Sequence, residues 1–236
     1  MMTETAEIER FDALATDWWQ EDGPMAMLHA MHPTRMAFIR QQIDRAFPEG
    51  FHGKAALDVG CGGGITAESL ARLGFETQAL DGSAQLIATA RAHGEGLPIQ
   101  YHHTMLADFA EKHAGEFDLL CALEVIEHVD DPEAFLHDCV RCLRPNGLLI
   151  VSTINRTKKS RLLAIGLAEY VLHLLPVGTH DWNKFVRPSE IADALPECKI
   201  SGLSGMVPKA NMRDWHLQKR RVAVNYIMGL STSTNQ

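Results

Sequence analysis

The chain has 236 residues, of which 46% are hydrophobic and 22% are charged, as is typical of a soluble globular domain. Its net charge of −8 disfavours nucleic acid as a partner, because phosphate binding needs a positively charged surface. No run reaches the roughly 20 apolar residues that cross a bilayer, and the acidic N-terminus is unlike a secretory signal. The five scattered cysteines indicate buried thiols in a reducing compartment. We therefore expect one cytoplasmic domain over residues 1–236.

Two helices are predicted before the first strand, and together they would form a helical lid over about residues 5–46. The segment 5–20 has helical periodicity with one apolar face, formed by Ile8, Phe11, Leu14, Ala15, Trp18 and Trp19. Gly23-Pro24 ends this helix. The second helix is predicted over residues 34–46, after Pro33.

From residue 55 onward, strand and helix patterns alternate along the chain. Strands are predicted near residues 55–59, 76–80, 98–102, 117–122 and 147–153. This alternation is typical of an α/β fold with a Rossmann-like, doubly wound and mostly parallel sheet. Such sheets bind ligands at the C-terminal ends of their strands, where we expect Asp58, Asp81 and the region Cys121–Glu124.

The first strand leads into a glycine-rich turn, Asp58-Val59-Gly60-Cys61-Gly62-Gly63-Gly64, and then into an amphipathic helix from Ile65 to Leu73. Glycines let a ligand approach the main chain, and the helix N-terminus favours an anionic or polar group. Asp81 ends the second strand, where a carboxylate accepts hydrogen bonds from ribose hydroxyls. These features predict an adenosine-containing cofactor.

The glycine spacing separates two kinds of adenosine cofactor. A dinucleotide site has the pattern Gly-x-Gly-x-x-Gly, and Ile65 stands at its third glycine position, so an NAD-binding oxidoreductase is disfavoured. The pattern Asp-x-Gly-x-Gly-x-Gly resembles the first motif of class I S-adenosylmethionine (SAM) methyltransferases. We therefore predict that Asp58, Gly60, Gly62 and Asp81 bind SAM.

A second group of candidate residues follows the fourth strand. Glu124, Glu127 and His128 are spaced i, i+3 and i+4, so a helical turn would place all three on one face. They could hold a divalent cation, for which two oxygen ligands favour Mg²⁺. Alternatively, His128 or Glu124 acts as the catalytic general base on a phenolic hydroxyl. In a third interpretation, Glu127 and His128 only cap the helix that follows.

A helical insertion is predicted near residues 156–187, where the alternation stops. It begins with four cations within six positions: Arg156, Lys158, Lys159 and Arg161. The mostly apolar segment Leu162–Leu175 follows and is too short to span a membrane. The pattern fits either an interfacial amphipathic helix or a core helix with a solvated basic start.

Several motifs together resemble the ubiquinone-biosynthesis O-methyltransferases, over roughly residues 8–228. They are Trp18-Trp19, His32-Pro33-x-Arg35, Leu57-Asp58-Val59-Gly60-Cys61-Gly62-Gly63-Gly64, Glu124-x-x-Glu127-His128-Val129, Ser152-Thr153-Ile154-Asn155-Arg156, Gly178-Thr179-His180-Asp181-Trp182 and Val224-Asn225-Tyr226. The resemblance implies SAM-dependent O-methylation of 2-polyprenyl-6-hydroxyphenol and 3-demethylubiquinol. Another small-molecule methyltransferase and a non-catalytic SAM-binding scaffold of a quinone-biosynthesis complex remain as alternatives.

The resemblance also assigns expected roles to individual residues. Arg35 would pair with the methionyl carboxylate of SAM, Gly60 would lie beneath that end, and Asp81 would hold the ribose hydroxyls. Leu123 would offer backbone and apolar contact, and Leu106 is a further candidate cofactor contact.

The expected partners follow from the same resemblance. Eukaryotic relatives use the Glu-x-x-Glu-His positions for Mg²⁺, which makes Mg²⁺ a candidate second cofactor. The basic and apolar insertion is the family's membrane-contacting segment. This implies a bacterial protein bound peripherally to the anionic inner face of the cytoplasmic membrane, near other quinone-biosynthesis proteins.

Overall fold

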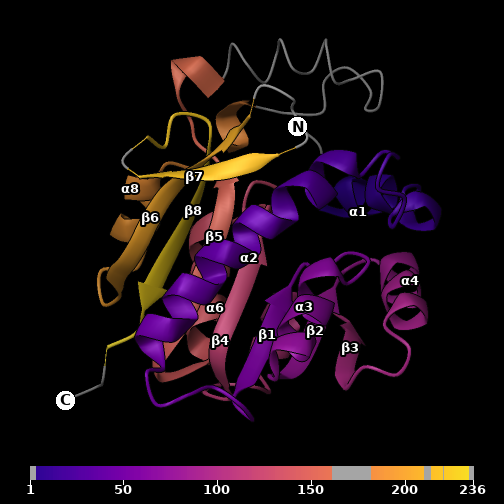
Figure 1. Cartoon of the computed structure of the whole chain (residues 1–236), viewed down its shortest axis with the longest axis horizontal. Helices are drawn as coiled ribbons and strands as arrows, with labels where there is room; N and C mark the ends of the chain where they lie inside the picture. Colours follow the sequence, from indigo (N-terminus) through magenta and orange to yellow (C-terminus); the bar gives the residue numbers. More distant parts are fainter. Residues whose placement is uncertain (1–3, 161–181, 210–213, 220, 234–236) are drawn as a thin grey trace.

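A central sheet organises the chain, as Figure 1 shows. The computed structural model describes residues 4–160, 182–209, 214–219 and 221–233. Within these residues the strand order is β3-β2-β1-β4-β5-β8-β6-β7. The strands are β1 (Ala55–Val59), β2 (Glu76–Asp81), β3 (Ile99–His103), β4 (Phe117–Leu123), β5 (Leu143–Ile154), β6 (Lys199–Pro208), β7 (Trp215–Lys219) and β8 (Asn225–Ser231).

The sheet has a parallel half and an antiparallel half. Strands β1 to β5 pair in parallel, which confirms the predicted Rossmann-like arrangement. Strand β8 pairs antiparallel with both β5 and β6, and β6 pairs antiparallel with β7. The sequence pattern did not predict these last three strands individually, and β5 begins at Leu143, earlier than the predicted residue 147.

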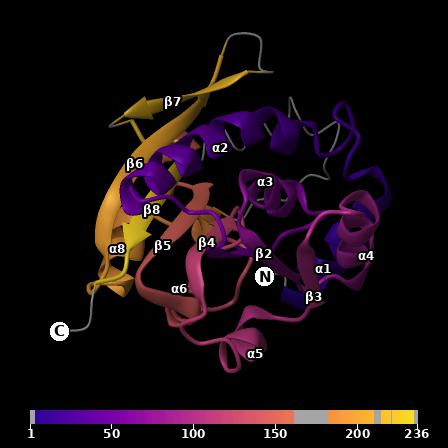
Figure 2. The same ribbon diagram turned by 60° about the horizontal axis from the view of Figure 1, so that its bottom comes forward.

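Helices cover both faces of the sheet, as Figure 2 shows from a second side. They are α1 (Glu4–Asp12), α2 (Ala26–Ala46), α3 (Ile65–Leu73), α4 (Ala84–His93), α5 (Leu106–Ala110), α6 (Pro132–Cys142) and α8 (Pro188–Ala194), with short 3₁₀ turns at η1 (Ala15–Asp17) and η2 (Trp182–Lys184). Helices α2 and α3 lie on one face, and α5, α6 and α8 lie on the other.

Strand β4 shows why the core forms on both faces. Leu119 packs with Phe38 and Ile39 of α2, whereas the next residue, Leu120, packs with the α5 and α6 side of the sheet. Side chains alternate between the two faces of a strand, so a strand buried on both sides is apolar throughout. Leu119 and Leu120 are both fully buried.

The two N-terminal helices differ from their predicted bounds. Helix α1 ends at Asp12, and the chain then turns through η1, so residues 5–20 are not one helix. Helix α2 begins at Ala26 and contains Pro33 in its interior. Proline removes one backbone hydrogen bond there, but the buried face of α2 from Met31 to Ile43 packs against the sheet and outweighs this loss.

The predicted insertion is only partly described. Residues 161–181, and with them the apolar segment Leu162–Leu175, lie outside the described residues. Within the described part of the chain, none of the helices combines the length and apolarity needed to cross a bilayer.

Candidate active site

A cavity of 480 Å³ lies at the C-terminal edge of the parallel strands. Its volume is within the range of about 300–1,000 Å³ that is usual for small-molecule sites. It brings together most of the predicted site residues: Arg35, Asp58, Gly60, Gly62, Asp81, Leu106, Leu123, Glu124 and His128. Glu127 is not among the residues that line it.

The glycine-rich turn forms one wall of the cavity. Gly60, Gly62 and Gly64 have positive φ angles of 64°, 53° and 95°. A Cβ atom on Gly62 would lie 2.2 Å from a ring carbon of Trp18, and one on Gly63 would lie 2.3 Å from another. The turn therefore needs glycine both for its backbone angles and because the Trp18 indole lies directly against it.

Asp81 lies where β2 meets this turn. Its carboxylate accepts hydrogen bonds from the Gly62 N–H at 2.9 Å and the Ser83 N–H at 2.8 Å. Burial raises the pKa of Asp81 above its ordinary value, although these backbone N–H groups oppose the increase. A carboxylate has about four acceptor positions, so Asp81 can still accept hydrogen bonds from ribose hydroxyls.

Asp58 carries a buried carboxyl oxygen whose partner is missing among the described residues. The residue is 2% exposed, and its Oδ2 atom accepts no hydrogen bond there. Burial raises the pKa of Asp58 to about 8, and the nearby Asp81 charge adds to this effect. An unsatisfied acidic group in a ligand cavity fits a site for a cationic amino group, such as that of SAM.

Arg35 and Glu124 form an ion pair on the cavity wall. Arg35 Nη2 lies 3.1 Å from Glu124 Oε1, and the Ser152 hydroxyl donates a hydrogen bond of 2.6 Å to the same oxygen. Glu124 has a φ angle of 57°, a left-handed conformation that is rare for a residue with a side chain. Two contacts thus hold the Glu124 carboxylate, the predicted alternative base, against Arg35.

The proposed metal ligands do not converge. Glu127 accepts a hydrogen bond of 2.7 Å from Thr153, and burial raises its pKa above the ordinary range. Glu124 contacts Arg35, whereas His128 contacts a different helix. Among the described residues, no group of three or more His, Cys, Asp or Glu side chains could hold a metal ion. The prediction of a Mg²⁺ site is therefore not supported.

His128 pairs with Glu7, a residue that the sequence patterns did not select. Its Nδ1 atom lies 3.4 Å from Glu7 Oε2. Burial alone would lower the pKa of His128, but Glu7 and the charges of Glu127 and Glu124 raise it above its ordinary value. The Phe11 ring contacts the His128 imidazole edge-on, with 5.4 Å between ring centroids. Helix α1 therefore supplies part of the cavity wall.

The segment after α1 contacts the glycine-rich turn and helix α4. Trp19 donates a hydrogen bond of 2.9 Å from its indole N–H to the Gly63 carbonyl, and its ring stacks on His93 of α4. The Ser83 hydroxyl also donates a hydrogen bond to Asp12. These contacts join residues 44 to 74 positions apart, so no local sequence pattern could have revealed them.

Known proteins resemble the chain over most of its length. The methyltransferase domain family model matches residues 27–197. The ubiquinone biosynthesis O-methyltransferase of Cereibacter sphaeroides strain ATCC 17025 is 41% identical over 233 residues, which cover 94% of each chain. The protein of the same name from Xanthomonas oryzae pv. oryzae strain PXO99A is 39% identical over 229 residues, covering 94% of this chain and 92% of its own.

Solved structures share the fold. Magnesium protoporphyrin IX methyltransferase from Synechocystis PCC 6803, solved with S-adenosylhomocysteine (SAH), aligns with a TM-score of 0.68 and 17% identity, covering 98% of this chain and 99% of its own. An N-methyltransferase from Bradyrhizobium japonicum WM9, also in complex with SAH, gives a TM-score of 0.63 and 16% identity, with the same coverage. From its methyltransferase domain and its full-length relatives, we conclude that this chain belongs to the ubiquinone biosynthesis O-methyltransferase family.

Proposed function

We propose that the chain transfers a methyl group from SAM to a phenolic oxygen of a polyprenylated substrate in ubiquinone biosynthesis. The substrates would be 2-polyprenyl-6-hydroxyphenol and 3-demethylubiquinol. The observation that carries the proposal is that a single cavity joins the glycine-rich turn and Asp81 to the imidazole of His128. The cavity could therefore hold SAM and the phenolic substrate side by side, with a candidate base next to the phenol.

The cofactor wall would bind SAM at its two ends. Asp81 would accept the ribose hydroxyls, while Arg35 and Asp58 would receive the carboxylate and amino groups of the methionyl part. When bound, SAM supplies a methyl group on a sulfonium, which passes to the attacking oxygen as SAH is formed. Of the predicted lid over residues 5–46, we propose that the part before α2 covers the cavity, because Phe11 and Trp18 line it and limit the access of water, whereas α2 packs against the sheet.

His128 is our candidate for the general base. A phenol has a pKa of about 10, so its proton must be taken up as the oxygen attacks. The Glu7 carboxylate lies 3.4 Å from Nδ1 and favours the protonated ring, so the imidazole can take up this proton at Nε2. No step is assigned to Mg²⁺, because Glu124, Glu127 and His128 each bind a different partner.

A direct assay tests this function. The protein is incubated with SAM and a catechol that carries a short prenyl tail, and mass spectrometry is used to detect a product heavier by one methyl group. Asp81→Ala should weaken SAM binding in calorimetry, since each charge-assisted hydrogen bond contributes about 1.5–3 kcal/mol. SAM binding without product would favour the scaffold, and binding of NADH but not SAM would overturn the methyltransferase proposal.

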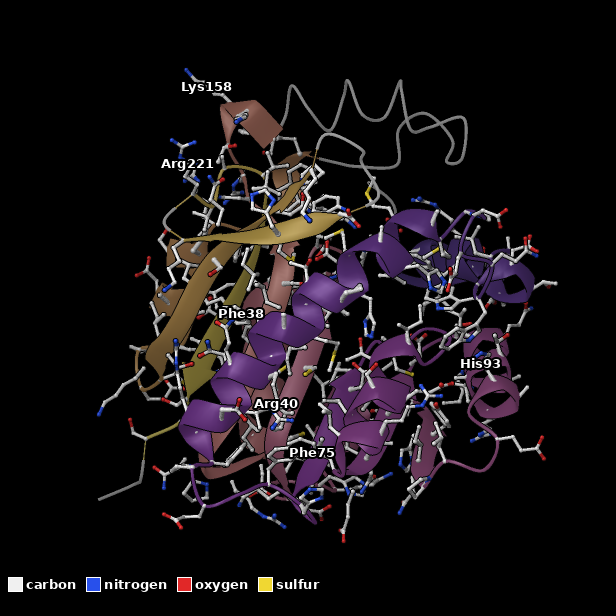
Figure 3. The ribbon with its side chains drawn as sticks, viewed as in Figure 1. Phe38, Arg40, Phe75, His93, Lys158 and Arg221 are labelled. Atoms are coloured by element: carbon white, nitrogen blue, oxygen red, sulfur yellow. The ribbon has the colours of Figure 1, made fainter. Side chains whose placement is uncertain are left out.

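We also propose peripheral binding to the anionic inner face of the cytoplasmic membrane, near other quinone-biosynthesis proteins. Lys158, Lys159, Arg187 and Arg221 are exposed. Lys158 and Arg221 project from the same end of the molecule (Figure 3), where Thr157 donates a hydrogen bond to the Ala223 carbonyl. Each cation near an anionic surface adds about 1 kcal/mol of attraction.

Vesicle co-sedimentation tests the membrane proposal. Replacing Lys158 and Lys159 with Ser should weaken binding to vesicles that contain an anionic lipid by about tenfold or more. The charge-matched control replaces Lys112 and Arg141, two exposed cations elsewhere on the molecule, and should bind normally. Equal sedimentation with neutral and anionic vesicles would contradict the proposal.

A further inference from the structure

Arg35 is a buried cation in the cavity wall. Among the described residues that line the cavity, it is the only lysine or arginine, whereas seven are aspartate or glutamate. The residue is 2% exposed, and its Nε atom has no acceptor among the described residues. A buried guanidinium with an unused donor is a site for a carboxylate, which is the group that this planar cation binds best.

Glu124 already occupies part of that site. Its Oε1 atom lies 3.1 Å from Arg35 Nη2, and the hydroxyl of the fully buried Ser152 holds the same oxygen at 2.6 Å. Ser152 also accepts the Glu124 backbone N–H through its carbonyl oxygen at 2.9 Å. Both the side chain and the left-handed backbone of Glu124 are therefore fixed by the neighbouring strand β5.

We propose that Glu124 is an internal competitor for Arg35, which sets how strongly the site binds the carboxylate of SAM. This inference rests on the proposed function, in which SAM lies in the cavity. A carboxylate that reaches Arg35 shares the guanidinium with Glu124 and is repelled by its charge. The repulsion is stronger than in bulk water because the Arg35 and Glu124 side chains are only 3% and 20% exposed. SAH keeps the same carboxylate, so the competition also promotes release of the product.

This role differs from those that the sequence suggested for Glu124. A base or a metal ligand would act on the substrate, whereas an internal competitor acts on the cofactor alone. The two kinds of role can therefore be separated by comparing two ligands that differ only in the carboxylate. Decarboxylated SAM retains the sulfonium, amino and adenosine groups and lacks only the carboxylate. The ratio of its dissociation constant to that of SAM isolates recognition by Arg35.

Calorimetry with both ligands tests the proposal on the full chain. Glu124→Gln keeps an oxygen for Ser152 and Arg35 but removes the charge. We expect it to tighten SAM relative to decarboxylated SAM by about tenfold. Ser152→Ala, which frees the Glu124 side chain while removing only one hydroxyl, should tighten SAM selectively by a smaller factor. Glu133→Gln is the charge-matched control, because Glu133 is exposed on α6 and does not line the cavity, so its ligand ratio should not change.

The alternative outcomes are distinct. An equal change for both ligands would show only a general charge effect and would overturn the proposal. Selective weakening of SAM in Glu124→Gln would also overturn it, since Glu124 would then support Arg35. If wild-type protein bound neither ligand, the proposed function itself would fail, and this inference would fail with it.

Discussion

Substituting Asp58 with asparagine should stabilise the protein, and more so as the pH rises. The Asp58 carboxyl is buried, and its pKa is raised from 3.8 to about 8 by burial. Between these two values the unfolded chain releases a proton that the folded chain retains, so stability falls as the pH increases. Asparagine has nearly the same shape as the protonated acid and does not ionise.

The size of the effect follows from the two pKa values. The free-energy penalty on folding is about 2 kcal/mol at pH 5 and about 5 kcal/mol at pH 8. These values are upper limits, because local relaxation around an ionised Asp58 reduces the penalty. The advantage of Asp58→Asn over wild type should therefore grow by up to about 3 kcal/mol between pH 5 and pH 8, which is a large part of a typical domain stability of about 5–15 kcal/mol.

Urea unfolding of both proteins at several pH values between 5 and 9 measures this difference. Asp108→Asn is the matched control, because Asp108 is exposed on α5, and its stability difference should not vary with pH in this range. The reasoning is refuted if the advantage of Asp58→Asn is the same at pH 5 and pH 8. It is also refuted if the variant loses stability as the pH rises, since an ionised Asp58 would then stabilise the fold.

Three further predictions concern catalysis and the lid. Glu7→Gln should lower the pKa of His128, so the rise of kcat/KM with pH should move to lower pH. The control Glu9→Gln, at an exposed neighbouring position, should leave the profile unchanged. Identical profiles for the wild type and both variants would contradict the pairing of His128 with Glu7. Turnover should persist in EDTA, because Glu124, Glu127 and His128 each contact a different partner. A loss of turnover in EDTA that added Mg²⁺ restores would contradict this prediction. Gly63→Ala should weaken SAM binding in calorimetry, since the added methyl would lie 2.3 Å from the Trp18 ring; unchanged affinity would mean that the indole moves away readily.

The parallel half of the fold could be predicted from the sequence because its signals are local. Strands β1 to β4 agree with their predicted bounds to within about two residues, since each is a short apolar run next to a turn. Asp58 and Asp81 were expected at the C-terminal edge for the same reason, and both line the cavity. Helix α2 was placed too late because Pro33 suggested a boundary that tertiary packing overrides.

The rest of the site depends on contacts between distant parts of the chain. Glu7 approaches His128 across 121 sequence positions, and Trp18 lies against Gly62 and Gly63 from the N-terminal segment. The Glu-x-x-Glu-His spacing suggested that the three side chains share a helical face. The backbone is left-handed at Glu124 instead, and Glu124, Glu127 and His128 contact separate partners. A pattern gives spacing, whereas the direction of each side chain comes from the folded backbone.

The position of β8 affects how the protein can be assembled during synthesis. Strand β8 follows β6 and β7 in the sequence, yet it lies between β5 and β6 and pairs with both. When residues 199–219 leave the ribosome, the β6–β7 hairpin has no partner strand, and an isolated hairpin is only marginally stable. Until residues 225–231 emerge, β5 also presents an open edge, which is prone to aggregation. Translation must therefore reach β8 before the two halves of the sheet can join.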